Sequence, residues 1–329
     1  MRWPLKTGIG NVMAAMVERK PSRMNLVGLE VKGSIGSPFS PFAISRALRR
    51  SATDRDGVYW SAGFVPPAVM DIPSVVTVHD LTHLRFYSRF HAAYYNHYLK
   101  PLYRLCSAIV CVSDYTRREF LEWSGMPPNK VSVVYNSVDS IYLENQESAK
   151  MPYRYVLYPG NHRSYKNLQR LISAYAASAL PQRDIHLAMT GNVNQALVGH
   201  ARRAGVESRL HFLGRVNDED LPKLYKGALF VAFVSLYEGF GLPIVEAMAS
   251  GVPVVTSNVS AMPEVAGNAA LIVDPYSIKD IAKGLNRLAC DDGFCSELVA
   301  RGREQVARFD WDRSAQELWG IVEHVYESA

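Results

Sequence analysis

The chain has 329 residues, 48% of them hydrophobic and 20% charged, a composition that excludes disordered and fibrous proteins and a length that favours two domains over one. The formal net charge of +5 is uneven: residues 1–150 hold 18 Lys and Arg against 12 Asp and Glu, a net of +6, whereas residues 151–329 hold 18 against 19, a net of −1. A basic first half suggests an anionic partner, such as a phosphorylated lipid, a membrane face or nucleic acid.

The first residues are a poor start for a parallel α/β domain, which normally opens with an apolar strand that runs into a glycine-rich loop. Only seven residues precede Gly8, and they include Pro4, which cannot donate to a strand ladder. We therefore expect no full strand in residues 1–7, a weakly anchored loop around Gly8 and Gly10, and a first sheet that begins with Met24–Val31.

The rest of the first half alternates short apolar runs with helical stretches. The predicted strands are Met24–Val31, Gly57–Trp60, Val75–His79, Ala108–Ser113 and Val131–Tyr135. The predicted helices are Val12–Arg19, Ser40–Arg50, Arg89–Leu105 and Tyr115–Trp123. The strand runs are rich in Val and Ile without polar alternation, which is typical of parallel strands buried on both faces.

A polar stretch, Asn136–Pro152, is interpreted as a linker, and the alternation restarts after it. The predicted strands are Tyr155–Tyr158, His186–Thr190, Leu210–Phe212, Leu229–Val234, Val252–Thr256 and Ala270–Val273. The predicted helices are Asn167–Ser178, Gln195–Ala204, Asp218–Lys226, Pro243–Ala249 and Asp312–Tyr326.

The two alternating halves predict an α/β protein with two doubly wound, Rossmann-like domains that face each other across a cleft. We place the domains at residues 1–148 and 149–311. Periodicity leaves open whether residues 312–329 stay with the second domain or rejoin the first.

The most informative segment follows a predicted strand and enters a predicted helix: Glu238-Gly239-Phe240-Gly241-Leu242-Pro243-Ile244-Val245-Glu246. Pro243 suits a first helical position, and the glycines let a ligand approach the backbone closely. A helix N-terminus with free amides attracts anions. The two carboxylates, Glu238 and Glu246, can accept hydrogen bonds from hydroxyls such as those of a sugar and a ribose. The alternative is a tight turn before a structural helix.

This segment resembles the Glu-x7-Glu motif of retaining glycosyltransferases of family 4, which have the GT-B fold. The resemblance covers nearly the whole chain and is strongest over residues 155–275, which include Ser250-Gly251-Val252-Pro253 and Met262-Pro263-Glu264-Val265. It implies that Glu238 contacts the hydroxyls of the donor sugar and Glu246 the ribose. The amides around Gly239, Phe240, Gly241 and Leu242 would hold the diphosphate.

Two further segments follow predicted strands of the second half. Arg163 and Lys166 lie just beyond the first of these strands, where cations can neutralise a diphosphate and stabilise a leaving nucleotide. Lys166 matches its family position well, whereas Asn161 stands where the family commonly has a basic residue. The resemblance also implies that Arg215 and Val216, after Leu210–Phe212, lie at the nucleobase.

In the first half, His79 ends a predicted strand and resembles the family histidine that faces the reacting sugar. A structural histidine is the alternative. His79 and His83 also stand at the spacing of a two-histidine metal site, but they begin at a strand end, and Asp80 replaces the glutamate of metalloproteases. The resemblance gives Gly10 a place near the donor phosphates. The cysteines, Cys106, Cys111, Cys290 and Cys295, form two spaced pairs that we interpret as ordinary thiols rather than zinc ligands.

The segment Arg85–Arg104 interleaves seven aromatic side chains with basic ones, a pattern that suits a membrane interface or a lipid-phosphate acceptor. The alternative is a helix packed on its sheet with cations that reach solvent. No run of eighteen apolar residues occurs and the first residues lack the apolar core of a signal peptide, so we expect a cytoplasmic protein, with peripheral attachment to the inner face of the cell membrane as a further hypothesis.

Together these features predict a retaining hexosyltransferase with no metal or other cofactor, whose catalytic residues are His79, Lys166 and Glu238. No paired carboxylates of glycosidase type are evident, so no protein nucleophile is assigned. The resemblance favours GDP-mannose as donor, then a UDP-hexose, and a glycan or polyprenyl-linked acceptor in bacterial polysaccharide biosynthesis. A catalytically inactive nucleotide-sugar-binding protein is the alternative, and no motif supports nucleic acid as a partner.

Overall fold

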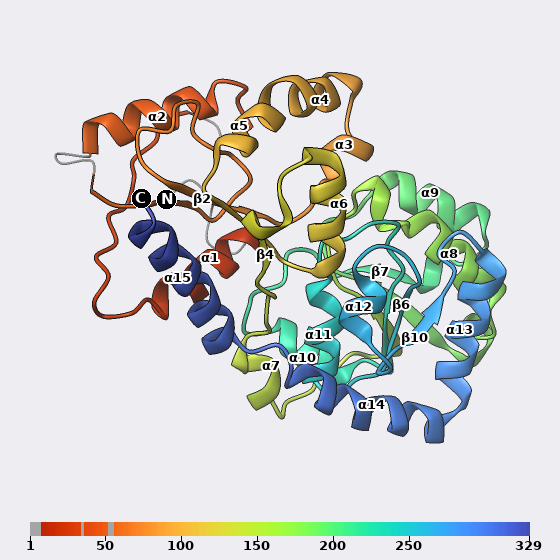
Figure 1. The fold of residues 1–329 in the computed structure, drawn as a ribbon. Helices are drawn as coiled ribbons and strands as arrows, with labels where there is room; N and C mark the ends of the chain where they lie inside the picture. The colour runs from red at the N-terminus through yellow and green to blue at the C-terminus, as the bar shows by residue number, and fades with distance from the viewer. Residues whose placement is uncertain (1–7, 34–35, 52–55) are drawn as a thin grey trace. The chain divides into compact units, whose positions relative to one another are not determined.

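A computed structural model describes residues 8–33, 36–51 and 56–329 (Figure 1). The chain forms two compact units. The first contains the chain up to Asn136 together with Asp310–Ala329, and the second is Ser137–Phe309. Each contains a parallel sheet, as the alternation of apolar runs and helical stretches predicted.

The sheet of the first unit has the strand order β1-β2-β3-β4, and every pair of neighbours is parallel. The strands are β1 (Tyr59–Ser61), β2 (Ser74–Val78), β3 (Ala108–Cys111) and β4 (Val131–Val133). All residues of β2 and β3 are buried. The two central strands therefore pack against other elements on both faces, which explains their unbroken apolar sequence.

The helices of the first unit are α1 (Gly8–Glu18), α2 (Ser40–Ser51), α3 (Thr82–Arg85), α4 (Arg89–Tyr94), α5 (Lys100–Leu105), α6 (Asp114–Ser124) and α15 (Trp311–Glu327). Figure 1 shows α15 beside α1. The indole nitrogen of Trp319 donates to the backbone oxygen of Met16 at 3.0 Å, and its ring meets Trp60 edge-on at 5.1 Å. The last helix thus completes the core of the first unit, a question that periodicity left open.

The predicted helix Arg89–Leu105 contains a change of pitch. A π-helical turn, Tyr95–Leu99, joins α4 to α5. Leu99 and Tyr103 are fully buried against β3 and α6 residues such as Ile109 and Phe120. One side of this stretch is therefore core, as the structural alternative required, and the other side is exposed.

Two predictions for the first unit are wrong. Met24–Val31 forms no strand: Val27 is 72% exposed, and the inward side chains, Leu29 and Val31, pack onto Ile44 of α2 rather than beside a neighbouring strand. The expected loop at residues 8–11 is the first turn of α1. Among the described residues the sheet begins with β1, and the prediction about residues 1–7 lies outside them.

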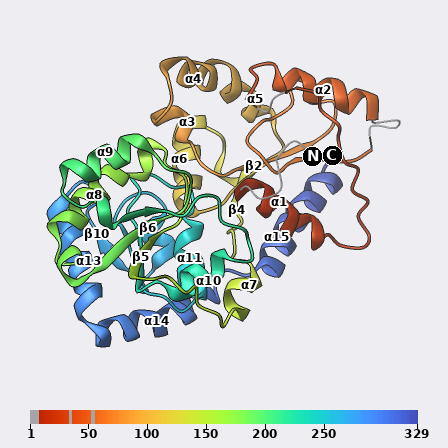
Figure 2. The same ribbon diagram turned by 180° about the vertical axis from the view of Figure 1, so that it is seen from behind.

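The second unit has a six-stranded parallel sheet of order β10-β9-β8-β5-β6-β7. Its strands are β5 (Arg154–Tyr158), β6 (Ile185–Met189), β7 (Leu210–Phe212), β8 (Phe230–Phe233), β9 (Val254–Ser257) and β10 (Leu271–Val273). β8 and β9 are buried throughout, because helices cover both faces of the sheet (Figure 2).

The helices of this unit are α7 (Ser140–Glu144), α8 (Leu168–Ala177), α9 (Gln195–Arg203), α10 (Leu221–Gly227), α11 (Leu242–Ala249), α12 (Met262–Ala266), α13 (Ile278–Cys290) and α14 (Asp292–Val306). α7 lies in the stretch interpreted as a linker. Tyr142 of α7 is buried edge-on against Tyr225 of α10 at 5.4 Å. The packing of α7 joins this stretch to the second unit, so the unit begins at Ser137, earlier than the expected boundary at 149.

Candidate functional site

The carboxyl ends of parallel strands share one edge of a sheet, and ligands of such sheets bind there. In the second unit the loops after β5, β6 and β8 leave this edge, and they carry most of the residues singled out in the sequence.

The loop after β8 leads into α11. Gly239 and Gly241 are buried, and Gly241 adopts a φ of +106°, a conformation that side chains rarely allow. Phe240 is buried and meets Phe309 edge-on at 5.3 Å. Leu242, half-buried, begins the helix. Phe240 thus anchors the loop, and the backbone amides at the start of α11 form the turn that the motif predicted.

Two of the predicted site residues form an ion pair. The Nζ atom of Lys166 lies 2.6 Å from Oε1 of Glu238, and their side chains are only 10% and 13% exposed. The ammonium group also lies 5.1 Å from the centre of the Phe233 ring. The backbone N–H of Glu238 donates to Oγ of Ser260 at 3.0 Å. The two residues are 72 positions apart in the sequence, and their ion pair connects the loop after β5 to the loop after β8.

Asn167, which the sequence analysis did not single out, fastens these loops. It follows a short 3₁₀ turn, Ser164–Lys166, with a φ of +63°. Its side-chain amide donates to the backbone oxygens of Val234 at 3.0 Å and Pro275 at 2.8 Å. An Asn directly after Lys166 at a predicted helix start was the available signal in the sequence. Asn167 therefore fixes the position from which Lys166 reaches Glu238.

Glu246 lies one turn into α11, and its residue surface is half-buried. The hydroxyl of Tyr225 donates to its Oε2 atom, and the phenol of the nearby Tyr142 also lowers the pKa of this carboxyl. Burial raises the pKa of Glu246 to about 7, against the lowering effect of the two phenols and of Lys166. Glu246 is therefore a carboxyl that exchanges its proton near neutral pH.

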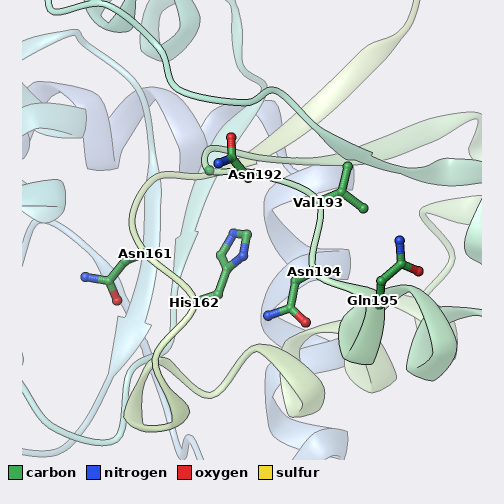
Figure 3. Close-up of a pocket in the computed structure, with 7 residues that line it drawn as sticks. Asn161, His162, Asn192, Val193, Asn194 and Gln195 are labelled. Carbon is green, nitrogen blue, oxygen red and sulfur yellow. The ribbon is translucent and has the colours of Figure 1, made fainter.

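A pocket of about 460 Å³ opens beside the loops after β5 and β6 (Figure 3). It is lined by Asn161, His162, Gly191, Asn192, Val193, Asn194 and Gln195. Figure 3 shows the ring of His162 between Asn161 and Asn194. Nε2 of His162 lies 2.8 Å from the backbone oxygen of Thr190. The lining is rich in amides, which offer both hydrogen-bond donors and acceptors. No motif in the sequence predicted this pocket, and the available signal was Gly191, which directly follows the predicted strand His186–Thr190.

The other predicted residues of this unit lie around the same edge. Gly191 and Gly214 form an isolated bridge, with N···O distances of 2.8 and 3.1 Å. Arg215, exposed, and Val216, half-buried, follow Gly214. Arg163 is exposed in the turn before Lys166.

The remaining predicted residues belong to the first unit. His79 follows β2, and its Nε2 atom lies 2.7 Å from the backbone oxygen of Ala62. Burial lowers the pKa of His79, so the ring is neutral at pH 7. Asp80 accepts a hydrogen bond at 2.9 Å from the N–H of Thr82, the first residue of α3. Gly10 is buried within α1.

Over residues 8–33, 36–51 and 56–329, no group of three or more His, Cys, Asp or Glu side chains is placed to hold a metal ion. Cys106 and Cys111 are buried, and burial raises the pKa of Cys106 to about 12. In the same part of the chain, no helix is both long and apolar enough to cross a membrane.

Comparison with known proteins gives consistent matches over both units. Residues 142–305 match the family described as glycosyl transferases group 1, and residues 24–140 match glycosyltransferase family 4. The O-antigen chain mannosyltransferase B of Escherichia coli is 31% identical over 274 residues, which cover 78% of this chain and 72% of that protein.

Two solved structures share the fold at low sequence identity. WaaG, a glycosyltransferase involved in lipopolysaccharide biosynthesis, aligns with a TM-score of 0.75 at 15% identity and covers 97% of each chain. Anabaena HepE in complex with UDP and glucose aligns with a TM-score of 0.70 at 19% identity over 88% of this chain and 76% of that one.

Proposed function

This chain belongs to the glycosyltransferases of group 1 and family 4, and from that premise we propose that it transfers mannose from GDP-mannose to a growing bacterial surface glycan. The proposal rests on one observation at the start of α11: Lys166 forms an ion pair with Glu238 and interacts electrostatically with Glu246. Mannose is favoured because the Escherichia coli relative is a mannosyltransferase, and a UDP-hexose is the second donor to test because HepE was solved with UDP and glucose.

The donor roles follow from the charges and from the resemblance. The amides at the start of α11 and the Lys166 ammonium hold the diphosphate, because both offer positive potential at a strand end. Glu238 accepts hydrogen bonds from the sugar hydroxyls, and Glu246 accepts them from the ribose. Arg163 is a second cation for the diphosphate. Arg215 and Val216, which follow the Gly191–Gly214 bridge, are proposed to contact the nucleobase, as the family resemblance implies.

The proposed reaction is metal-independent and retains the configuration at the anomeric carbon. The bond from that carbon to the diphosphate breaks, a bond to an acceptor oxygen forms, and the acceptor hydroxyl passes its proton to the departing diphosphate. Lys166 and the helix amides stabilise the charge that develops on the departing nucleoside diphosphate. His79 faces the reacting sugar in this proposal, and Gly10 lies on the phosphate side.

The acceptor is proposed to be a glycan carried on a polyprenyl lipid. The support is an aromatic–basic face in the first unit, defined by Phe39, Phe42, Tyr87, Phe90, Arg46, Arg50 and Arg89, all exposed. Phe90 is 87% exposed and Phe42 54%. Tyr94 Oη donates to the backbone oxygen of Pro38 at 3.2 Å, which brings the start of α2 to α4. Neither Ser40–Ser51 nor Arg85–Arg104 contains an acidic residue.

A donor screen tests the proposed activity. GDP-mannose should raise the melting temperature more than UDP-glucose does, because a ligand that binds only the folded state stabilises it. The preferred donor should then be consumed with release of its nucleoside diphosphate when a mannose-containing acceptor is added. Stabilisation by a donor without any turnover would instead identify an inactive nucleotide-sugar-binding protein, and no stabilisation by either donor would contradict the proposal.

A further inference from the structure

Glu246 interacts with two tyrosines that come from different helices. Tyr225 of α10 is fully buried and donates to Oε2, and Tyr142 of α7 is buried and its phenol lowers the pKa of the same carboxyl. The two rings pack edge-to-face at 5.4 Å, which restricts both hydroxyls. Three helices thus fix one carboxyl group, whereas a carboxylate that served only to start α11 would need neither phenol.

The number of lone pairs on a carboxylate makes this arrangement informative. An ionised carboxylate offers about four acceptor positions. The Tyr225 hydroxyl uses one of them, and the positions that remain can accept both O–H donors of a ribose diol. A protonated carboxyl carries a donor of its own and offers fewer acceptors, so it suits a diol poorly.

The charged and titratable groups around Glu246 bring its pKa close to neutral pH, so that the carboxyl can lose its proton on ligand binding. Burial disfavours the ionised form, while Tyr225, Tyr142 and the nearby Lys166 favour it. Behind the phenols, Tyr158 of β5 interacts with Tyr225, and Asp139 and Asp218 interact electrostatically with Tyr142. The pKa of Glu246 is about 7 as a result, and loss of either phenol would raise it further.

We propose that Tyr142 and Tyr225 are positioning residues that aim the Glu246 carboxylate at the ribose diol, so that nucleotide binding expels a proton from this carboxyl to solvent. The inference rests on the proposed function, which gives Glu246 the ribose. It adds two residues on other helices and a dependence of donor affinity on pH. The nucleotide binds the ionised form, so affinity is highest above pH 7 and falls as the pH is lowered through 7.

The test compares GDP with 2′,3′-dideoxy-GDP by calorimetry between pH 6 and pH 8.5. The two ligands carry the same titrating phosphates, and only GDP has the diol. Between pH 8 and pH 6 the Kd for GDP should rise about tenfold more than the Kd for the dideoxy ligand. A ratio of the two Kd values that stays constant across this range would overturn the inference.

Tyr225→Phe distinguishes positioning from packing. Without the phenol the Glu246 carboxyl is harder to ionise. The pH at which the ratio of the two Kd values changes should therefore be higher in the variant. At pH 8.5 its affinity for GDP should come close to the wild-type value. Tyr142→Phe should act in the same direction and serves as the second variant if Tyr225→Phe does not fold. Equal weakening at every pH would show that the hydroxyls only support packing.

Tyr175→Phe is the matched control. Tyr175 is a buried tyrosine of the same unit whose hydroxyl donates to the backbone oxygen of Ile185 at 2.8 Å, away from Glu246. Its loss should leave the pH profile unchanged. If UDP binds and GDP does not, UDP and 2′,3′-dideoxy-UDP replace the pair. Binding of neither nucleotide overturns the proposed function together with this inference, whereas binding with a flat ratio overturns the inference alone.

Discussion

At the scale of single residues, the ion pair between Lys166 and Glu238 links two roles that the sequence treated separately. Each side chain neutralises the other at 2.6 Å in a largely buried position. A diphosphate would compete with Glu238 for the ammonium, and a sugar hydroxyl would compete with Lys166 for the carboxylate. Substitution of either residue therefore also changes the state of its partner, because an uncompensated charge in a buried site is unfavourable.

We expect Lys166→Met to weaken GDP binding about tenfold or more, because it removes a charge-assisted contact worth roughly 1.5–3 kcal/mol. Glu238→Gln should lower turnover more than GDP affinity, since GDP lacks the sugar. Calorimetry and donor turnover measure the two effects. Lys279→Met, on the exposed part of α13, is the control that should change neither. Equal losses of GDP affinity in both site variants would refute this division of roles.

At the scale of an element, the start of α11 depends on backbone conformation as much as on side chains. Gly241 has a φ of +106°, and a Cβ atom there would lie 3.1 Å from the Cδ1 atom of Ile244. Gly241→Ala should reduce the free energy of unfolding by about 1–3 kcal/mol through backbone strain. It should also weaken GDP binding, because the strained turn presents the amides.

The control for this element is Gly199→Ala in α9. Its Cβ would meet only the end of Arg203 at 3.7 Å, an ordinary contact, and helical alanine is favoured over glycine by up to about 1 kcal/mol. We expect this variant to be more stable than the wild type with unchanged GDP affinity. Urea denaturation measures both variants, and a Gly241→Ala protein as stable as the wild type would contradict the role given to the turn.

At the scale of the whole molecule, the excess positive charge lies in the first half of the sequence, and the aromatic–basic face concentrates part of it. Vesicles of phosphatidylglycerol and phosphatidylethanolamine should bind the protein, and binding should weaken as salt rises, because each basic residue near the surface contributes about 1 kcal/mol. Phe42→Ser with Phe90→Ser should weaken sedimentation with vesicles. Tyr276→Ser, an exposed aromatic of the second unit, should not. Salt-independent binding, or none, would remove the membrane hypothesis.

The two units also differ in their sheets. The described sheet of the first unit has four strands and that of the second has six, and in each sheet the two edge strands have three residues. Met24–Val31, moreover, contributes no ladder hydrogen bonds. We expect hydrogen exchange to show the amides of β2 and β3 opening at lower free energy than those of β5 and β8. The reverse order would contradict the expectation that the first unit is the less stable one.

Much of the fold followed from local sequence. Runs such as Ala108–Cys111 and Phe230–Phe233 are apolar without alternation, and each forms a buried parallel strand within a residue or two of its predicted bounds. The Glu-x7-Glu segment predicted its own loop and helix for the same local reason, since glycine and proline restrict the backbone where they stand. Met24–Val31 failed because an apolar run predicts burial, and burial on a helix satisfies it as well as a strand does.

What the sequence by itself determined was the α/β class, the family and the segments that carry the chemistry, because these depend on patterns only a few residues long. The tertiary structure alone decided which distant segments meet. In the folded protein α15 packs in the first unit, Lys166 forms an ion pair with Glu238, and Tyr142 lies close enough to Glu246 to lower its pKa. The order of strands in the sheet sets those contacts, and that order depends on the packing of the whole unit rather than on any short run of residues.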